Sequence, residues 1–271
     1  ILLNLALQYL IELRNHPVGE RSPLKRMMWI LLGEAAIVLA AIPAYNRAGA
    51  VLAPAALLFG IVMTWLLGDD RKAELVDFPH LAERAMLYVV FTFGEMIIAI
   101  AAYFEGALTG RSVYFTAACF LVVVGLFLSY ELLYDRIIDR EKRTNGMFYM
   151  MVHVFLIFAL NLITAALGFM RDEGVDLLPK MGMLVGALLL YYGCLFSTIR
   201  YARPCCRPKL GFKLPVLAGS AAFAALMLLF RENMAVNIAL TVAYVFGVFA
   251  LVYGLSRQTM TKMGGDSSEG R

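Results

Sequence analysis

The sequence predicts an all-α protein, a polytopic transmembrane helical bundle of about nine helices. Of its 271 residues, 61% are hydrophobic and only 16% are charged, and the mean hydropathy is +0.75. Soluble domains carry about 25% charged residues. Apolar runs of about 18 to 25 residues recur along the chain, which is the length that crosses the hydrocarbon core of a bilayer. Transmembrane barrel strands are about 10 residues long and alternate in polarity, so these runs predict helices.

The apolar runs predict one transmembrane domain, residues 1–256, followed by a polar tail, residues 257–271. The tail is rich in Gly and Ser, and we expect it to be disordered. Nine spans are predicted within the domain, at residues 1–14, 26–45, 49–68, 80–104, 112–134, 147–170, 181–200, 214–230 and 235–256.

The distribution of Lys and Arg predicts the side that each connection faces. If the spans alternate in direction, the connections after spans one, three, five and seven, together with the tail, hold 18 of the 24 basic residues. The other connections hold five, and Arg84 falls inside the fourth span. Because basic loops stay in the cytoplasm, we expect a multi-pass protein of the cell membrane, inner or plasma, with a cytoplasmic C-terminus.

The fourth span carries the strongest functional signal. The stretch PHLAERAMLYVVFTFGEMIIAIAAYF, residues 79–104, is predicted to form a single helix that contains this span. Pro79 suits a first helical turn, and Asp77 can cap the free N–H groups there. The helix enters from the side predicted to be cytoplasmic, which places Glu95 near the middle of the membrane. An ionisable residue at that depth costs roughly 2.5 to 3.5 kcal/mol, so Glu95 indicates a functional site.

Four ionisable residues share one side of this span. At about 100° per residue, Arg84 and Glu95 lie about 20° apart around the helix axis and about 16 Å apart along it. His80 and Glu83 fall within an arc of about 120° on the same side. A bare carboxylate in hydrocarbon would stay protonated. The side of the helix that carries these four residues therefore predicts a polar pathway into the bundle. The alternative is an interfacial ion pair that fixes the register of the helix.

The block His80-Leu81-Ala82-Glu83-Arg84, with Gly94-Glu95 ten residues further on, resembles the H-x-A-E-R … G-E block of the low temperature requirement protein A (LtrA) family. The preceding LLGDDRKAELVDFP and the later YMMVHVFLIFAL, which contains His153, also fit the family. The resemblance covers residues 50–170 well and the flanks by hydropathy. It implies a bacterial multi-pass membrane protein and no particular substrate. Family members usually begin with further spans, which we expect this chain to lack.

A short internal similarity points to a second carboxylate. LLGEAAIVLAAI (31–42) resembles TFGEMIIAIAAY (92–103), so Glu34 corresponds to Glu95. A weak parallel repeat, residues 26–68 against 80–134, would explain the similarity, as in some transporters. Chance explains it equally well.

Three further polar residues are secondary candidates. Glu131 closes the fifth span, where a solvated helix end is expected. Arg84 can reach toward lipid phosphates or pair with Glu34 or Glu131. His153 lies inside the sixth span, as a packed, hydrogen-bonded residue or as a relay group. Asn161, two turns further on, is expected to bond another helix.

The sequence contains no H-E-x-x-H, G-x-S-x-G or phosphate-loop motif. We therefore expect no enzyme, no cofactor, no metal site and no nucleic-acid partner. The expected partners are the lipid bilayer and a small solute, proton or cation, and an oligomer is compatible with the sequence.

The first hypothesis for the function is a proton- or cation-coupled transporter of unknown substrate. In it Glu95, with Glu34, is the protonatable site, and His80, Glu83 and Arg84 form a cytoplasmic gate. The alternative is a membrane enzyme or lipid-binding protein that acts on anionic headgroups near Arg84. A membrane scaffold without a solute path is the third hypothesis.

Overall fold

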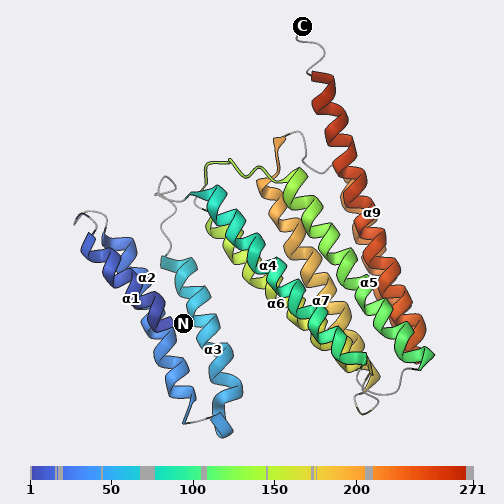
Figure 1. Cartoon of the computed structure of the whole chain (residues 1–271), viewed down its shortest axis with the longest axis horizontal. Coiled ribbons are helices and arrows are strands. Elements are labelled where there is room, and N and C mark those ends of the chain that lie inside the picture. Colours follow the sequence, from blue (N-terminus) through green and yellow to red (C-terminus); the bar gives the residue numbers. More distant parts are fainter. Residues whose placement is uncertain are drawn as a thin grey trace. The chain divides into compact units, whose positions relative to one another are not determined.

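The computed structural model describes residues 2–15, 17, 21–43, 45–67, 77–104, 109–144, 146–171, 174, 176–204 and 210–266. Within these residues the secondary structure is helical, apart from one isolated β-bridge. The α-helices of the described residues, most of them labelled in Figure 1, are α1 (Leu2–Asn15), α2 (Arg21–Ala41), α3 (Tyr45–Leu67), α4 (Phe78–Ala101), α5 (Gly110–Leu132), α6 (Met147–Arg171), α7 (Leu177–Ser197), α8 (Leu210–Leu229) and α9 (Met234–Asp266). Each predicted span corresponds to one helix, which confirms the predicted fold class.

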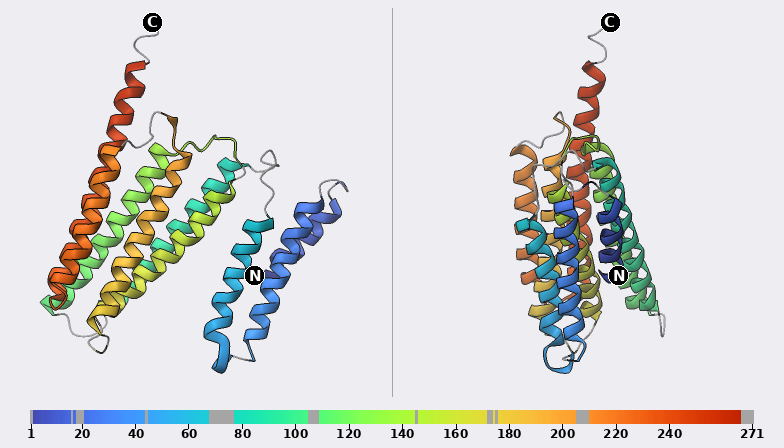
Figure 2. Two further views of the ribbon diagram at one scale, coloured as in Figure 1. Left: turned by 180° about the vertical axis from the view of Figure 1, so that it is seen from behind. Right: turned by 90° about the vertical axis from the view of Figure 1, so that its left-hand side faces the viewer.

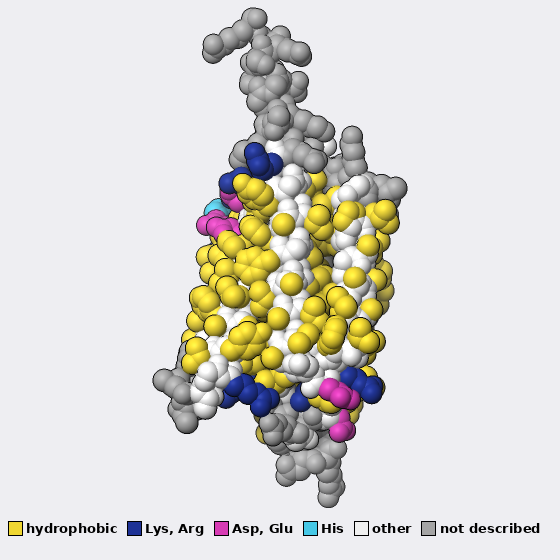
Figure 3. All heavy atoms as spheres, turned by 90° about the vertical axis from the view of Figure 1, so that its right-hand side faces the viewer, with side chains coloured by type: hydrophobic (Ala, Val, Ile, Leu, Met, Phe, Trp, Pro, Cys, Tyr) yellow, Lys and Arg dark blue, Asp and Glu magenta, His cyan; other side chains and the backbone are white. Residues whose placement is uncertain are grey.

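Six of the described helices are long and apolar enough to cross a membrane, and they are α4 to α9. In α3 the segment Pro54–Leu67 is apolar but shorter than these six. The face of the molecule drawn in Figure 3 carries a broad band of hydrophobic side chains, with charged side chains gathered at its two ends. This distribution is the one that a bilayer requires, with an apolar middle and polar ends.

The described helices fall into two compact units, and the single transmembrane domain stays a prediction. The first unit is Ile1–Val76 and the second is Asp77–Arg271. In the first unit α2 packs against both α1 and α3 (Figure 1). Residues 68–76, which belong to the segment that resembles the LtrA family, lie outside the described residues.

In the second unit helices that are distant in sequence pack side by side. The left-hand view of Figure 2 shows α4, α6, α7, α5 and α9 as neighbouring, similarly inclined helices. Helix α6 packs on α4 and α7, α5 packs on α4 and α9, and α8 packs on α9. One continuous hydrophobic core runs through the unit, and its largest fully buried side chains include Tyr149, Tyr191 and Leu126.

Helix α4 begins as the sequence predicts. The Oδ1 atom of Asp77 accepts a hydrogen bond of 3.3 Å from the backbone N–H of His80, and Pro79 lies in the first turn. The buried residues of α4 recur at helical spacing, with Ala82, Val89 and Met96 among them. This stripe is the face that packs against α5 and α6.

Helix α9 differs from its predicted span. It continues to Asp266, so residues 257–266, which we expected in a disordered tail, extend the helix. Residues 267–271 lie outside the described residues. The extension is polar in sequence. The end of the apolar run therefore does not mark the end of the helix.

Candidate functional site

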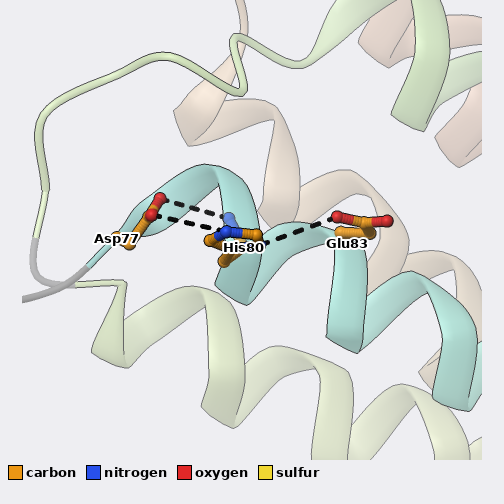
Figure 4. A network of polar contacts seen from close by, with 3 residues as sticks. All are labelled: Asp77, His80 and Glu83. Carbon is orange, nitrogen blue, oxygen red and sulfur yellow. Dashed lines mark hydrogen bonds and ion pairs between the residues drawn. The ribbon is translucent and has the colours of Figure 1, made fainter.

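The first turns of α4 carry a small group of polar contacts, shown in Figure 4. The Nε2 atom of His80 lies 3.8 Å from Asp77 Oδ2, and its Nδ1 atom lies 3.8 Å from Glu83 Oε2. All three side chains are 61 to 73% exposed. Ion pairs this exposed contribute about 0 to 1 kcal/mol, and these two exist only when the imidazole is protonated. The contacts therefore orient the side chains more than they stabilise the helix.

His80 and Glu83 also line a pocket with a volume of about 590 Å³. The pocket lies at the end of the second unit where α4 and α6 begin and α5 and α7 end. A cavity of this size is within the range of small-molecule sites. Six of its nine lining residues are acidic, basic or imidazole groups; the nine are Pro79, His80, Glu83, Met86, Tyr134, Asp139, Arg140, Glu141 and Arg203.

Two connections meet at the wall of this pocket, and backbone pairing holds them together. Ile138 and Ala202 form an isolated antiparallel β-bridge. The N–H of Asp139 donates to the carbonyl of Tyr201 at 2.8 Å, and the N–H of Arg203 donates to the carbonyl of Ile137 at 3.0 Å. The bridge ties the segment after α5 to the segment after α7. It thereby brings Asp139 and Arg203, 64 residues apart, to one site.

Side-chain contacts fix part of the charged wall. The Nη2 atom of Arg140 lies 3.7 Å from Asp135 Oδ1, and its guanidinium lies 5.2 Å from the centre of the Tyr134 ring. Nearby, the Nζ atom of Lys142 donates to the carbonyl of Arg200 at 3.0 Å. A cation–π contact such as the one between Arg140 and Tyr134 contributes about 0.5 to 1 kcal/mol at an exposed site. Arg140 is thus held beside the pocket.

A buried histidine–tyrosine group lies behind the pocket. Tyr134 stacks on Tyr130, with ring centres 6.2 Å apart and an interplanar angle of 10°. The Nδ1 atom of His153 lies 2.8 Å from the carbonyl oxygen of Tyr149, and its Nε2 atom lies 3.1 Å from the hydroxyl of Tyr130. Because a carbonyl only accepts, the neutral imidazole carries its proton on Nδ1, and Tyr130 donates to Nε2. His153 is buried and hydrogen-bonded, as the first interpretation predicted.

Removing the Tyr130 hydroxyl should therefore destabilise the protein. In Tyr130→Phe the Nε2 atom of His153 loses its donor while it remains buried. An unsatisfied buried acceptor costs about 1 to 3 kcal/mol. We expect a lower melting temperature in detergent, measured by loss of the monodisperse peak after heating. Tyr88→Phe, at a side chain that is 66% exposed, is the matched control and should melt like the wild type. Equal melting of both variants would contradict the hydrogen-bond assignment.

The remaining two residues of the predicted polar face lie outside the pocket. Arg84 and Glu95 are both exposed on α4, and no ion pair joins either of them to another described residue. Glu83 and Glu95 stand about 120° apart around the helix axis. The predicted single polar side thus divides into a pocket side, with His80 and Glu83, and an outer flank, with Arg84 and Glu95. Glu95 also lies about 8 Å beyond the midpoint of α4 rather than at it.

Glu34 lies in α2 of the first unit and is half-buried. A Cβ atom placed on Gly60 of α3 would lie 2.8 Å from the Oε2 atom of Glu34, so the carboxylate rests against the glycine backbone. Gly33 is packed as closely on the ring of Phe59, whereas a Cβ on Gly94 would meet none of the described atoms within 4 Å. The two Gly-Glu pairs therefore have different surroundings. The repeat hypothesis stays a prediction.

The secondary candidates are placed as follows. Glu131 is exposed near the end of α5, and among the described residues it forms no ion pair with Arg84. The Nδ2 atom of Asn161 donates to the carbonyl of Ile157 at 3.0 Å, one turn back in α6. The expectation that Asn161 bonds another helix is therefore wrong. Its side chain is exposed and bonds back to the preceding turn of its own helix, an alternative that Asn side chains commonly adopt.

The pocket residues Asp139, Arg140, Glu141 and Arg203 were missed by the sequence analysis. They lie in short charged connections, where a solvated loop is the ordinary explanation. The charged run from Asp135 to Arg143 was the available signal. Within the described part of the chain, no group of three or more His, Cys, Asp or Glu side chains is arranged to hold a metal ion.

The fold and the site define a multi-pass α-helical membrane protein with a polar pocket at one end of its helices. The family model for the bacterial low temperature requirement A protein (LtrA) matches residues 1–260. The chain therefore belongs to the LtrA family, and the match extends well beyond residues 50–170, where the resemblance was clearest. No curated protein and no solved structure matches the chain.

Proposed function

We propose that the protein is a proton- or cation-coupled membrane transporter, and that its solute binds in the polar pocket beside the start of α4. The observation that supports this most is the pocket itself. It combines ionisable side chains with a volume of about 590 Å³ at the end of helices that can cross a membrane. A scaffold has no need of such a cavity.

The charges of the pocket suggest the class of solute. Three carboxylates line it, from Glu83, Asp139 and Glu141, against two guanidinium groups, from Arg140 and Arg203. With His80 neutral, the wall carries one negative charge in excess. A wall of mixed charge with an acidic excess favours a small cation or zwitterion over an anion.

Glu95 is the proposed coupling group. Its side chain is exposed on a helix of transmembrane length, where an ionised carboxylate is costly. On this proposal, the carboxyl group of Glu95 carries the coupling proton or cation. Glu83 and Glu95 lie on the same helix, about 18 Å apart along its axis. A movement of α4 would therefore change the surroundings of both carboxylates at once.

The test uses purified protein in liposomes that contain a pH-sensitive dye. Sodium, potassium, and then a panel of small amines and amino acids are added outside, and the internal pH is followed. We expect at least one of these probes to change the internal pH. Glu83→Gln and Asp139→Asn should each raise the half-saturating concentration of that probe, because each removes a carboxylate from the pocket. Glu131→Gln, at an exposed glutamate outside the pocket, should behave like the wild type.

If folded protein gives no pH change with any probe, the transport proposal is wrong and the scaffold hypothesis gains. If a probe is transported but both pocket variants match the wild type, the transporter remains and the proposed binding site is wrong.

A further inference from the structure

A second cavity lies at the same end of the unit, between the end of α7 and the start of α8. Its volume is about 630 Å³. The walls are largely apolar, with Phe196 and Ile199 on one side and Phe212 and Val216 on the other. The lining also includes Leu217 and two basic side chains, Arg200 and Lys213, and none of its described residues is a carboxylate.

The two cations of this cavity are not neutralised by neighbouring acids. Within the described residues neither Arg200 nor Lys213 forms an ion pair, and both are exposed. The guanidinium of Arg200 lies 5.2 Å from the centre of the Phe148 ring, which holds it in place without reducing its charge. The rim of this cavity is therefore positive, in contrast with the mixed charges of the pocket beside α4.

An apolar groove begins where the charged cavity ends. It lies between α8 and α9, has a volume of about 390 Å³, and shares Val216 with the first cavity. None of the described residues that line it is charged. Gly219 and Gly247 lie in it, and a Cβ atom at either position would meet no described atom within 4 Å. Gly219 is about 9 Å along α8 from Lys213, so the groove runs from the charged end into the apolar band.

We propose that an anionic phospholipid occupies both sites, with its phosphate between Arg200 and Lys213 and an acyl chain in the α8–α9 groove. Basic pockets between transmembrane helices bind anionic headgroups. Long cationic side chains at helix ends reach toward the interface where the phosphates lie. Free phosphate would satisfy the cations but would leave the apolar groove unused. The site shares no lining residue with the pocket beside α4, so this proposal does not depend on transport.

The test is lipid retention, measured by native mass spectrometry of the full chain in detergent with added phosphatidylglycerol or phosphatidylcholine. The wild type is expected to retain phosphatidylglycerol preferentially. Arg200→Gln and Lys213→Gln should each reduce that retention about fivefold, since each basic residue near an anionic surface contributes about 1 kcal/mol. Gly219→Leu should also reduce it, because the new side chain fills the groove. Arg231→Gln, at an exposed arginine between α8 and α9 at the other end of the unit, is the matched control.

The outcomes separate the sources of the anion. Retention that survives both charge substitutions would overturn the proposal. A second result would also overturn the proposal: the charge variants lose the lipid, Gly219→Leu keeps it, and inorganic phosphate displaces it. That result would show an anion site without a bound acyl chain. The affected side chains are exposed or face open space, so the melting temperature without lipid should be unchanged in all variants.

Discussion

Replacing Glu95 by glutamine is expected to abolish the pH change that a transported probe produces in liposomes, to the level of liposomes without protein. Glutamine keeps nearly the same shape and can donate and accept hydrogen bonds, but it cannot bind or release a proton. Coupling through this position would therefore be lost while the helix is kept. The measurement is the internal pH of dye-loaded proteoliposomes after addition of the probe identified with the wild type.

The same substitution should leave the fold intact, which makes the result interpretable. Glu95 is exposed and forms no ion pair with another described residue, so little is lost from the folded state. The melting temperature of Glu95→Gln should match that of the wild type. Glu131→Gln, an exposed glutamate near the end of α5, should keep the full pH response. A full response in Glu95→Gln would reject Glu95 as the coupling group.

A leucine at Gly125 is expected to give the largest loss of stability. Gly125 lies where α5 meets α9, and a Cβ atom there would lie only 2.5 Å from the Cγ1 atom of Val245. Val245 is fully buried, and the two helices are closely packed over this region. Overpacking a tight core costs typically 1 to 3 kcal/mol and sometimes more. We expect Gly125→Leu to lower the melting temperature in detergent clearly and to reduce the yield of folded protein.

The control is a glycine that faces open space in another helix of membrane-spanning length. A Cβ atom on Gly193 of α7 would meet no described atom within 4 Å, so Gly193→Leu should melt near the wild type. Should Gly125→Leu prove as stable as Gly193→Leu, the close packing of α5 on α9 would be wrong.

The helices could be predicted from sequence because their signals are local. Hydrocarbon thickness fixes the length of each apolar run, and Asp77 with Pro79 marks the start of α4 within a few residues. The end of α9 could not be predicted in this way. Its final turns are polar, so the length of an apolar run does not mark where they stop.

The site could be predicted only in part. Helical geometry places Arg84 and Glu95 on one flank of α4, which the structure retains. It does not say which flank meets a cavity, because that depends on the neighbours of α4. Asp139 and Arg203 reach the pocket because Ile138 and Ala202 form a β-bridge. No local sequence pattern predicts a pairing between residues so far apart in the chain. The clustered charges after α5 were the one available hint.

Transport through the pocket beside α4 requires that water reaches it, and thiol labelling tests this most directly. Single cysteines are placed at Met86, which lines the pocket, and at its neighbour Leu87, which is 56% exposed on the outer side of α4. The background is a chain whose own cysteines are replaced by alanine. In membranes, a membrane-impermeant maleimide applied from the side of the 138–146 connection should label Met86→Cys and leave Leu87→Cys, which faces lipid, unlabelled. Protection of both cysteines, or labelling of Leu87→Cys alone, would contradict the account.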